Sequence, residues 1–139
     1  MKKDLIAAAT GARERAYAPY SRYAVGAAVR TPSGSIHAGC NVENAAYPEG
    51  WCAETSALAA MVSAAADGER RIVEVCVIAD KIEGRIVTPC GGCRQRLAEF
   101  GGPDTVVHAI SPDGDGVTYL LKDLLPAAFA MEDTVEPER

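Results

Sequence analysis

A nearly unbroken apolar run, IVEVCVIA, occupies residues 72–79 and is interrupted only by Glu74. A strand of this composition is buried on both faces, because the alternating side chains are apolar on either side. A sheet built around this strand must therefore be covered on both sides. The run predicts the central strand of an α/β fold whose helices pack on both faces of the sheet.

The rest of the chain supplies the elements that such a sheet needs. Helical spacing of apolar residues and helix-ending glycines predict helices at residues 3–16, 52–66 and 94–100. Apolar segments bounded by turn residues predict further strands at residues 24–31, 35–42, 105–110 and 117–121, the first two as a hairpin. We expect a mixed five-stranded sheet with helices on both faces. Residues 1–139 are expected to form one domain, with a mobile acidic tail at about residues 131–139.

The composition favours small-molecule chemistry. Hydrophobic residues make up 48% and charged residues 24% of the chain, and the formal net charge of −5 argues against binding to a nucleic acid polymer. No apolar run approaches the ~18 residues of a membrane-spanning helix. Charged residues interrupt the N-terminal segment, where a signal peptide would be apolar. We expect a cytoplasmic protein that acts on a small molecule and contacts neither membrane nor nucleic acid.

The chain has five cysteines, an odd number, and a disulfide framework is not expected in a cytoplasmic protein. Cys90 and Cys93 form a Cys-x-x-Cys pair, which is typical either of a zinc site or of a redox pair. A redox pair would be expected near the start of the chain, after a first strand. Cys40 and Cys76 lie inside predicted strands, where we expect small buried side chains.

Cys52 differs from these, because it opens a predicted helix and is followed two residues later by Glu54. The thiolates of Cys52, Cys90 and Cys93 could hold one zinc ion and leave a fourth position for water, as in catalytic zinc sites. Glu54 would then move a proton from that water to a leaving group. Taken alone, Glu54 is an ordinary first-turn glutamate favoured by the helix dipole. Its place beside Cys52 favours the catalytic role.

Such a site has an electrostatic difficulty. Three thiolates and Zn²⁺ carry a net charge of about −1, which makes bound water a weaker acid than at a zinc held by neutral histidines. Two helix N-termini directed at the metal would offset this charge, because their N–H groups donate to sulfur. Arg94, directly after Cys93, is the side chain expected to add a positive charge.

The triplet CAE at residues 52–54, followed by PCGGC at residues 89–93, matches the motif of zinc nucleobase deaminases. Four longer blocks resemble, in order and spacing, the small homotetrameric cytidine deaminases: APYSRYAVGAA, GCNVENAAYPEGWCAE, PCGGCRQ and LLPAAFAMED. The similarity covers about residues 17–133. It implies the three-layer cytidine-deaminase-like fold, one zinc ion per subunit, and a homotetramer whose sites are shared between subunits.

The resemblance also implies roles for individual residues. Cys52, Cys90 and Cys93 bind zinc, and Glu54 is the proton shuttle. Substrate contacts are implied for Asn41 and Glu43 at the ribose hydroxyls, the backbone of Ala53 and Cys90 at the base, Tyr23 beside the pyrimidine, Tyr47 at a subunit boundary, and Phe129 in a neighbouring subunit's site. Without the resemblance, Asn41 and Glu43 would be loop-capping residues and the aromatic side chains would belong to the core.

Two positions depart from the family pattern. Thr55 stands where family members commonly carry an arginine that donates to the zinc-bound thiolates, which leaves more of the charge compensation to Arg94 and the helix ends. Tyr23 stands where they usually carry phenylalanine, and its hydroxyl could change which base substituents fit. The zinc ligands and Glu54 match the pattern.

The activity implied by the resemblance is hydrolytic deamination of cytidine and 2′-deoxycytidine to the uridines, with release of ammonia. The two departures keep open a deaminase of a modified cytosine nucleoside or of a blasticidin-type aminonucleoside, although the NVEN block at residues 41–44 disfavours it. A non-catalytic zinc or nucleoside-binding protein would have no need of Glu54. A thiol–disulfide oxidoreductase would require Cys90 and Cys93 to cycle.

Overall fold

The structure is a computed structural model that describes residues 2–64 and 69–131. Its elements are, in chain order, α1 (Lys2–Arg13), β1 (Val25–Arg30), β2 (Ile36–Cys40), the 3-10 turn η1 (Tyr47–Glu49), α2 (Ala53–Ala64), β3 (Glu74–Ala79), α3 (Gly91–Phe100), β4 (Val106–Ile110), β5 (Gly116–Leu120) and α4 (Leu121–Leu124). None of the described helices is long and apolar enough to cross a membrane. Apart from its first residue, the tail expected at about residues 131–139 lies outside the described residues.

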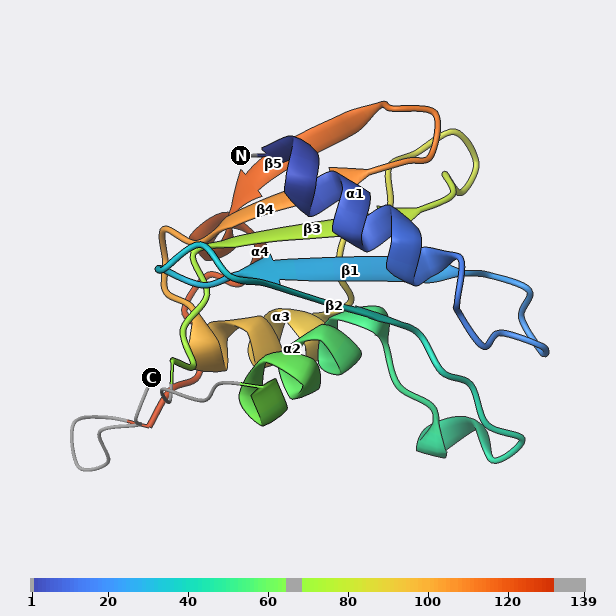
Figure 1. Cartoon of the computed structure of the whole chain (residues 1–139), viewed down its shortest axis with the longest axis horizontal. Coiled ribbons are helices and arrows are strands. Elements are labelled where there is room, and N and C mark those ends of the chain that lie inside the picture. Colours follow the sequence, from blue (N-terminus) through green and yellow to red (C-terminus); the bar gives the residue numbers. More distant parts are fainter. Residues whose placement is uncertain (1, 65–68, 132–139) are drawn as a thin grey trace.

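The five strands form one mixed sheet in the order β2-β1-β3-β4-β5 (Figure 1). The predicted hairpin is present, since β1 and β2 pair antiparallel with Arg30 opposite Ile36. β1 also pairs antiparallel with β3, and β5 pairs antiparallel with β4. β3 and β4 are parallel, and α3 lies in the crossover connection that a parallel pair requires. The mixed five-stranded sheet expected from the sequence is confirmed.

Helices cover both faces of this sheet, so that the molecule has three layers (Figure 1). On one face, α1 buries Leu5 and Ala9 against sheet residues that include Cys76. On the other face, α2, α3 and α4 enclose a second core that includes Ala27, Val29, Met61, Val75, Val77, Leu97 and Leu121. Neighbouring residues of β3 serve opposite cores, which explains why this segment is apolar nearly throughout.

Two helix borders differ from the predicted ones, at the end of α1 and at the start of α3. α1 ends at Arg13 and not at residue 16, because the chain turns there and the Arg13 guanidinium donates to the Ala24 carbonyl. α3 begins at Gly91 and not at residue 94, so that Cys90 is its N-cap and Cys93 lies in its first turn. The end of α2 predicted at residue 66 falls outside the described residues. The strand borders agree with the predicted ones to within two residues.

One glycine lets α2 lie very close to the sheet. A Cβ on Gly39 of β2 would lie 2.4 Å from the Ser56 Cβ and 2.6 Å from the Ala57 nitrogen, both in α2. No larger residue fits at these distances without moving the helix. Because Cys52 directly precedes α2, Gly39 helps to set where the first cysteine of the site lies.

Candidate active site

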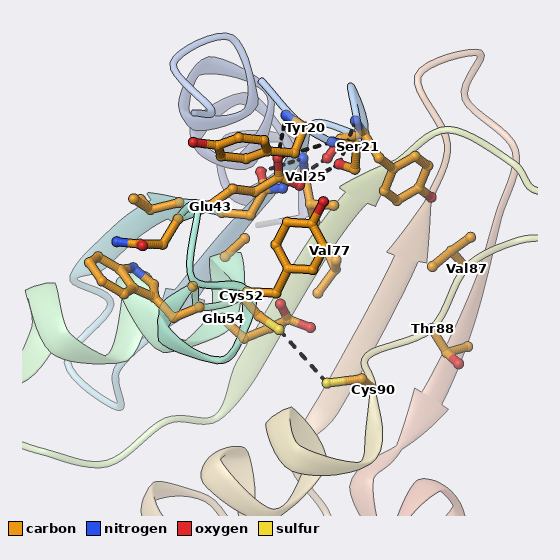
Figure 2. A pocket seen from close by; sticks show the side chains of 18 residues that line it. Tyr20, Ser21, Val25, Glu43, Cys52, Glu54, Val77, Val87, Thr88 and Cys90 are labelled. Atoms are coloured by element: carbon orange, nitrogen blue, oxygen red, sulfur yellow. Dashed lines mark hydrogen bonds between the residues drawn. The ribbon is translucent and has the colours of Figure 1, made fainter. Parts of the chain in front are cut away.

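The N-termini of α2 and α3 bring the two cysteine motifs together (Figure 2). Cys52 precedes α2, and its carbonyl accepts the hydrogen bond of the Ser56 nitrogen at 3.2 Å. Cys90 is the N-cap of α3, and its carbonyl accepts that of the Arg94 nitrogen at 2.9 Å. The sulfur atoms of Cys52 and Cys90 point toward one another and are 3.8 Å apart (Figure 2).

The sulfur atoms of Cys52, Cys90 and Cys93 fit a single zinc ion. All three lie within 4.8 Å of one another. With Zn–S bonds of about 2.3 Å, a tetrahedral site places its sulfur atoms about 3.8 Å apart, and Cys52 and Cys90 have this separation. Three thiolates leave one tetrahedral position open, as in a catalytic zinc site. The predicted ligand set is therefore brought together in the structure.

The two other cysteines lie apart from this cluster. Cys76 on β3 is buried, as predicted, and burial raises the pKa of its thiol to about 12. Cys40 on β2 is only half-buried, so the prediction of a buried side chain is wrong for this residue. Its strand lies at the edge of the sheet, where side chains are less completely covered.

Local hydrogen bonds and charges favour a thiolate at Cys52. The hydrogen bonds from Cys93 and then Cys90, together with the positive charge of Arg96, lower the Cys52 pKa to about 6 despite its partial burial. The pKa of Cys93 is raised, because its thiol is hydrogen-bonded to Cys52 and buried. The free N–H groups in the first turns of α2 and α3 also stabilise negative charge at this point.

Glu54 is a buried carboxyl beside these thiols. It lies in the first turn of α2, is only 3% exposed, and lies next to Cys52 in Figure 2. Burial, reinforced by the negative charge of Cys52, raises the pKa of the Glu54 carboxyl to about 7. A carboxyl with such a pKa can both accept and donate a proton near neutral pH, which is what a proton shuttle must do.

The cluster opens into a cleft of about 600 Å³, a volume typical of small-molecule sites. Several residues that the sequence placed at the substrate site line this cleft: Tyr23, Asn41, Glu43, Tyr47 and Ala53. Cys52, Cys90 and Glu54 line it as well. Metal ligands, proton shuttle and expected substrate contacts thus share one cavity.

Asn41 and Glu43 hold the loop that forms one side of the cleft. The Asn41 amide accepts a hydrogen bond from the Val25 nitrogen at 2.9 Å and donates one to the Tyr23 carbonyl at 2.8 Å. The Glu43 carboxylate accepts bonds from two consecutive backbone N–H groups and from the Ser21 hydroxyl. The bond from Ser21 is the main cause of a lowered pKa of Glu43. Both residues therefore cap a loop, and their contact with ribose stays a prediction.

The two tyrosines expected near the substrate differ in their surroundings. The Tyr23 hydroxyl donates to the Asp80 carbonyl at 2.6 Å, in the loop that follows β3. The group that distinguishes Tyr23 from phenylalanine is thus bound to protein. Tyr47 is 76% exposed and packs edge to face on Tyr20, with ring centroids 6.0 Å apart. An exposed ring at the edge of the cleft is not a core side chain.

Phe129 lies away from this cleft. It follows α4, is 71% exposed, and its carbonyl accepts a hydrogen bond from the Gln95 amide at 3.0 Å. Its neighbours belong to a second groove along the ends of α3 and α4. A site in which Phe129 takes part would therefore belong to another copy of the chain, and this contact stays a prediction.

Arg94 does not place its guanidinium at a sulfur of the cluster, and its expected role in offsetting the charge of the site stays a prediction. Its guanidinium donates to the carbonyls of Pro89 and Leu124, at 2.7 and 2.8 Å, and to a threonine hydroxyl. It therefore ties the loop before α3 to α4. Nη1 of Arg96 lies 3.8 Å from Sγ of Cys93 instead. Residues three apart share one face of a helix, whereas adjacent residues do not.

Sequence reasoning also missed some residues that line the cleft. The Trp51 indole N–H donates to the Ser56 hydroxyl at 2.7 Å, and this hydroxyl donates to the Cys40 carbonyl at 2.7 Å. Val87 and Thr88 line the side of the cleft away from Glu43 (Figure 2). Trp51, Val87 and Thr88 each lie at most three residues before a ligand cysteine. This closeness in sequence could have indicated that they line the cleft.

Comparisons with known proteins agree with this geometry. Residues 1–109 match the family described as "Cytidine and deoxycytidylate deaminase zinc-binding region". The chain is 45% identical to the cytidine deaminase of Halalkalibacterium halodurans, over 95% of this chain and 96% of that protein. It is also 45% identical to that of Sporosarcina psychrophila, over 94% and 93%. The crystal structure of cytidine deaminase from Burkholderia pseudomallei superposes with a TM-score of 0.84 at 42% identity, covering 93% of this chain and 99% of that one.

Proposed function

This chain belongs to the zinc-binding cytidine and deoxycytidylate deaminase family, and we propose that it hydrolyses cytidine and 2′-deoxycytidine to the corresponding uridines and ammonia. The observation that carries the proposal is the buried Glu54 carboxyl beside three convergent thiols at one end of a nucleoside-sized cleft. A structural zinc site would need neither an open ligand position nor a buried acid beside it.

The residues have separate tasks in this reaction. Cys52, Cys90 and Cys93 would hold zinc, which when bound acts as a Lewis acid that makes water nucleophilic near neutral pH. Glu54 accepts one proton of the attacking water and delivers it to N3 of the cytosine ring. It then carries the second proton to the amino group, which leaves C4 as ammonia. A pKa of about 7 lets the carboxyl serve in both directions.

Replacing Glu54 with glutamine tests this mechanism. The substitution keeps the size of the side chain and removes the exchangeable carboxyl, so we expect kcat for cytidine to fall by at least about a hundredfold. Cytidine absorbance and ammonia release measure the rate, and zinc content must be determined on the same samples. Glu99→Gln is the matched control, because Glu99 is an exposed glutamate of α3. An undiminished rate in Glu54→Gln at full zinc content would exclude the mechanism.

The sugar contacts of the proposal rest on Asn41 and Glu43, which lie together on one side of the cleft. A site that pairs a hydroxyl rejects substrates that lack it, because its polar groups are then left unpaired. We propose that these two residues contact the ribose hydroxyls. Because 2′-deoxycytidine lacks only the 2′-hydroxyl and keeps the 3′-hydroxyl, both nucleosides react. Parallel assays of cytidine, 2′-deoxycytidine, 5-methylcytidine and blasticidin S, followed by ammonia release, give the preference directly.

We also propose a homotetramer in which Phe129 enters the site of a neighbouring subunit. Its support is the exposure of aromatic rings at and beyond the cleft, Tyr47 at 76% and Phe129 at 71%. Mixing tests it: Glu54→Gln and Phe129→Ala subunits, each weakly active alone, should regain activity after they are unfolded and refolded together. Complementation arises because some mixed sites receive an intact Glu54 and an intact Phe129. Unchanged activity in assembled mixed oligomers would exclude shared sites.

A further inference from the structure

A cation touches the thiol cluster from a position that the sequence did not indicate. Nη1 of Arg96 lies 3.8 Å from Sγ of Cys93, a fully buried side chain. In residues 2–64 and 69–131, no other lysine or arginine side chain lies within hydrogen-bonding distance of a cluster sulfur. A site of three thiolates and one Zn²⁺ has a net charge of about −1, and a guanidinium at a ligand sulfur offsets it.

The backbone of α3 leaves room for this guanidinium. A Cβ on Gly92 would lie 3.1 Å from Nη1 of Arg96, which is closer than ordinary van der Waals contact. A Cβ on the neighbouring Gly91 would meet nothing within 4 Å. Neither glycine has a positive φ. Gly92 is therefore explained by the space that Arg96 occupies and not by backbone conformation.

The facing helix α2 presents no positive charge at the same sulfur. The hydroxyl of Thr55 in α2 lies 4.0 Å from Sγ of Cys93. It can supply a weak hydrogen bond and no positive charge. Arg94, the other arginine of α3 near the cluster, has its donors on carbonyls and on a threonine hydroxyl. The positive charge at Cys93 thus comes from Arg96.

We propose that Arg96, in the space left by Gly92, is a positioning residue that holds the Cys93 thiolate and offsets the excess negative charge of the zinc site. This inference rests on the zinc site of the proposed function and on no property of the substrate. The compensating charge then comes from the second turn of α3, where Arg96 lies three residues after Cys93.

Zinc affinity, measured by competition with a chromophoric chelator, is the direct test. We expect Arg96→Gln to weaken zinc binding about tenfold, the low end of the effects seen for groups that contact metal ligands, because Arg96 is solvent-exposed. Arg85→Gln is the matched control for loss of one surface charge, since Arg85 is 79% exposed and pairs with Glu83 in the loop before the motif. Arg96→Met keeps the apolar stem and replaces Arg96→Gln should the latter fail to fold.

The glycine pair tests the same idea without removing the arginine. Gly91→Ala and Gly92→Ala make the same chemical change at neighbouring positions in the first turn of α3, and only the second brings a methyl group against the guanidinium. We expect weaker zinc binding in Gly92→Ala alone. In the background of Arg96→Gln, Thr55→Arg places a cation at the same sulfur from α2 and should restore part of the lost affinity.

A merely structural role for Arg96 would change the melting temperature of the zinc-free protein and leave its zinc affinity equal to that of Arg85→Gln. Equal affinities of Arg96→Gln and Arg85→Gln would overturn the proposal, as would a folded Thr55→Arg, Arg96→Gln variant with no recovery. Because the measured quantity is zinc binding, failure of the wild-type protein to deaminate cytidine would refute the proposed function and leave this comparison valid.

Discussion

Gly39 offers a sharp test of how the packing of α2 controls the site. In Gly39→Ala the new Cβ would lie 2.4 Å from the Ser56 Cβ and 2.6 Å from the Ala57 nitrogen. Carbon atoms in contact need about 3.5 Å, so α2 must retreat from β2 by about 1 Å. Overpacking of this kind costs about 1–3 kcal/mol of unfolding free energy. Near this chain length that corresponds to about 4 °C per kcal/mol in melting temperature.

The same displacement moves Cys52 and Glu54 relative to α3. A shift of about 1 Å in a catalytic group can lower the rate about a hundredfold, so we expect a comparable loss of kcat/KM for cytidine in the folded variant. Thermal unfolding, followed by circular dichroism, and the deaminase assay measure the two effects. Zinc content on the same samples shows whether the ligand set has also been disturbed.

Gly11→Ala is the matched control, because we expect it to raise stability where Gly39→Ala lowers it. Gly11 is an exposed residue of α1, and its added Cβ would meet nothing within 4 Å. Alanine should therefore stabilise the helix by about 1 kcal/mol without affecting the rate. A Gly39→Ala variant as stable and as active as Gly11→Ala would refute the reasoning, because it would mean that α2 accepts the extra methyl group without moving.

Two further predictions concern groups outside the metal cluster. Tyr23→Phe removes the hydroxyl bound to the Asp80 carbonyl; we expect a loss of about 1 kcal/mol or less in unfolding free energy, with KM for cytidine changed less than threefold, since the hydroxyl faces protein. Burial alone would raise the pKa of Glu74, but hydrogen bonds from His108 and Arg30 outweigh it and lower that pKa. Because this pKa is lower in the folded than in the unfolded protein, the ionised carboxyl stabilises the fold at pH values above the unfolded pKa near 4.3. This stabilisation is lost as the pH falls through the folded-state pKa. The stability difference between wild type and Glu74→Gln should therefore shrink below about pH 4, and a difference independent of pH in urea titrations would contradict this.

The sheet could be predicted because the sequence of its central strand is apolar nearly throughout. Residues 75–79 are apolar on both faces of the strand, and this pattern alone implies a helical layer on each side of the sheet. The start of α3 could not be predicted in the same way. Two consecutive glycines have low helix propensity, yet Cys93 and Leu97 are buried on the inner face of this helix and stabilise it from its first turn.

The start of this helix also decides which arginine lies beside the Cys93 sulfur. With a helix beginning at residue 94, Cys93 lies outside it, and the adjacent Arg94 is the natural neighbour of its sulfur. With the helix beginning at Gly91, Cys93 and Arg96 are separated by three residues and share one face. The contact was thus implied by the sequence once the helix border was known. The spacing between Cys52 and Cys90, by contrast, depends on tertiary packing that no local pattern specifies.

The composition of α2 has the same tertiary origin. Alanine is common on exposed helix surfaces because of its high helix propensity. Ala53 and Ala57 are both fully buried, so packing and not propensity explains them. At Ala57, α2 lies almost in backbone contact with Gly39 of β2. A larger side chain at the fully buried Ala57 would therefore also displace the helix. Ala57→Val should therefore lower stability and zinc retention together, whereas a loss of stability without loss of zinc would show that the sulfur spacing is set elsewhere.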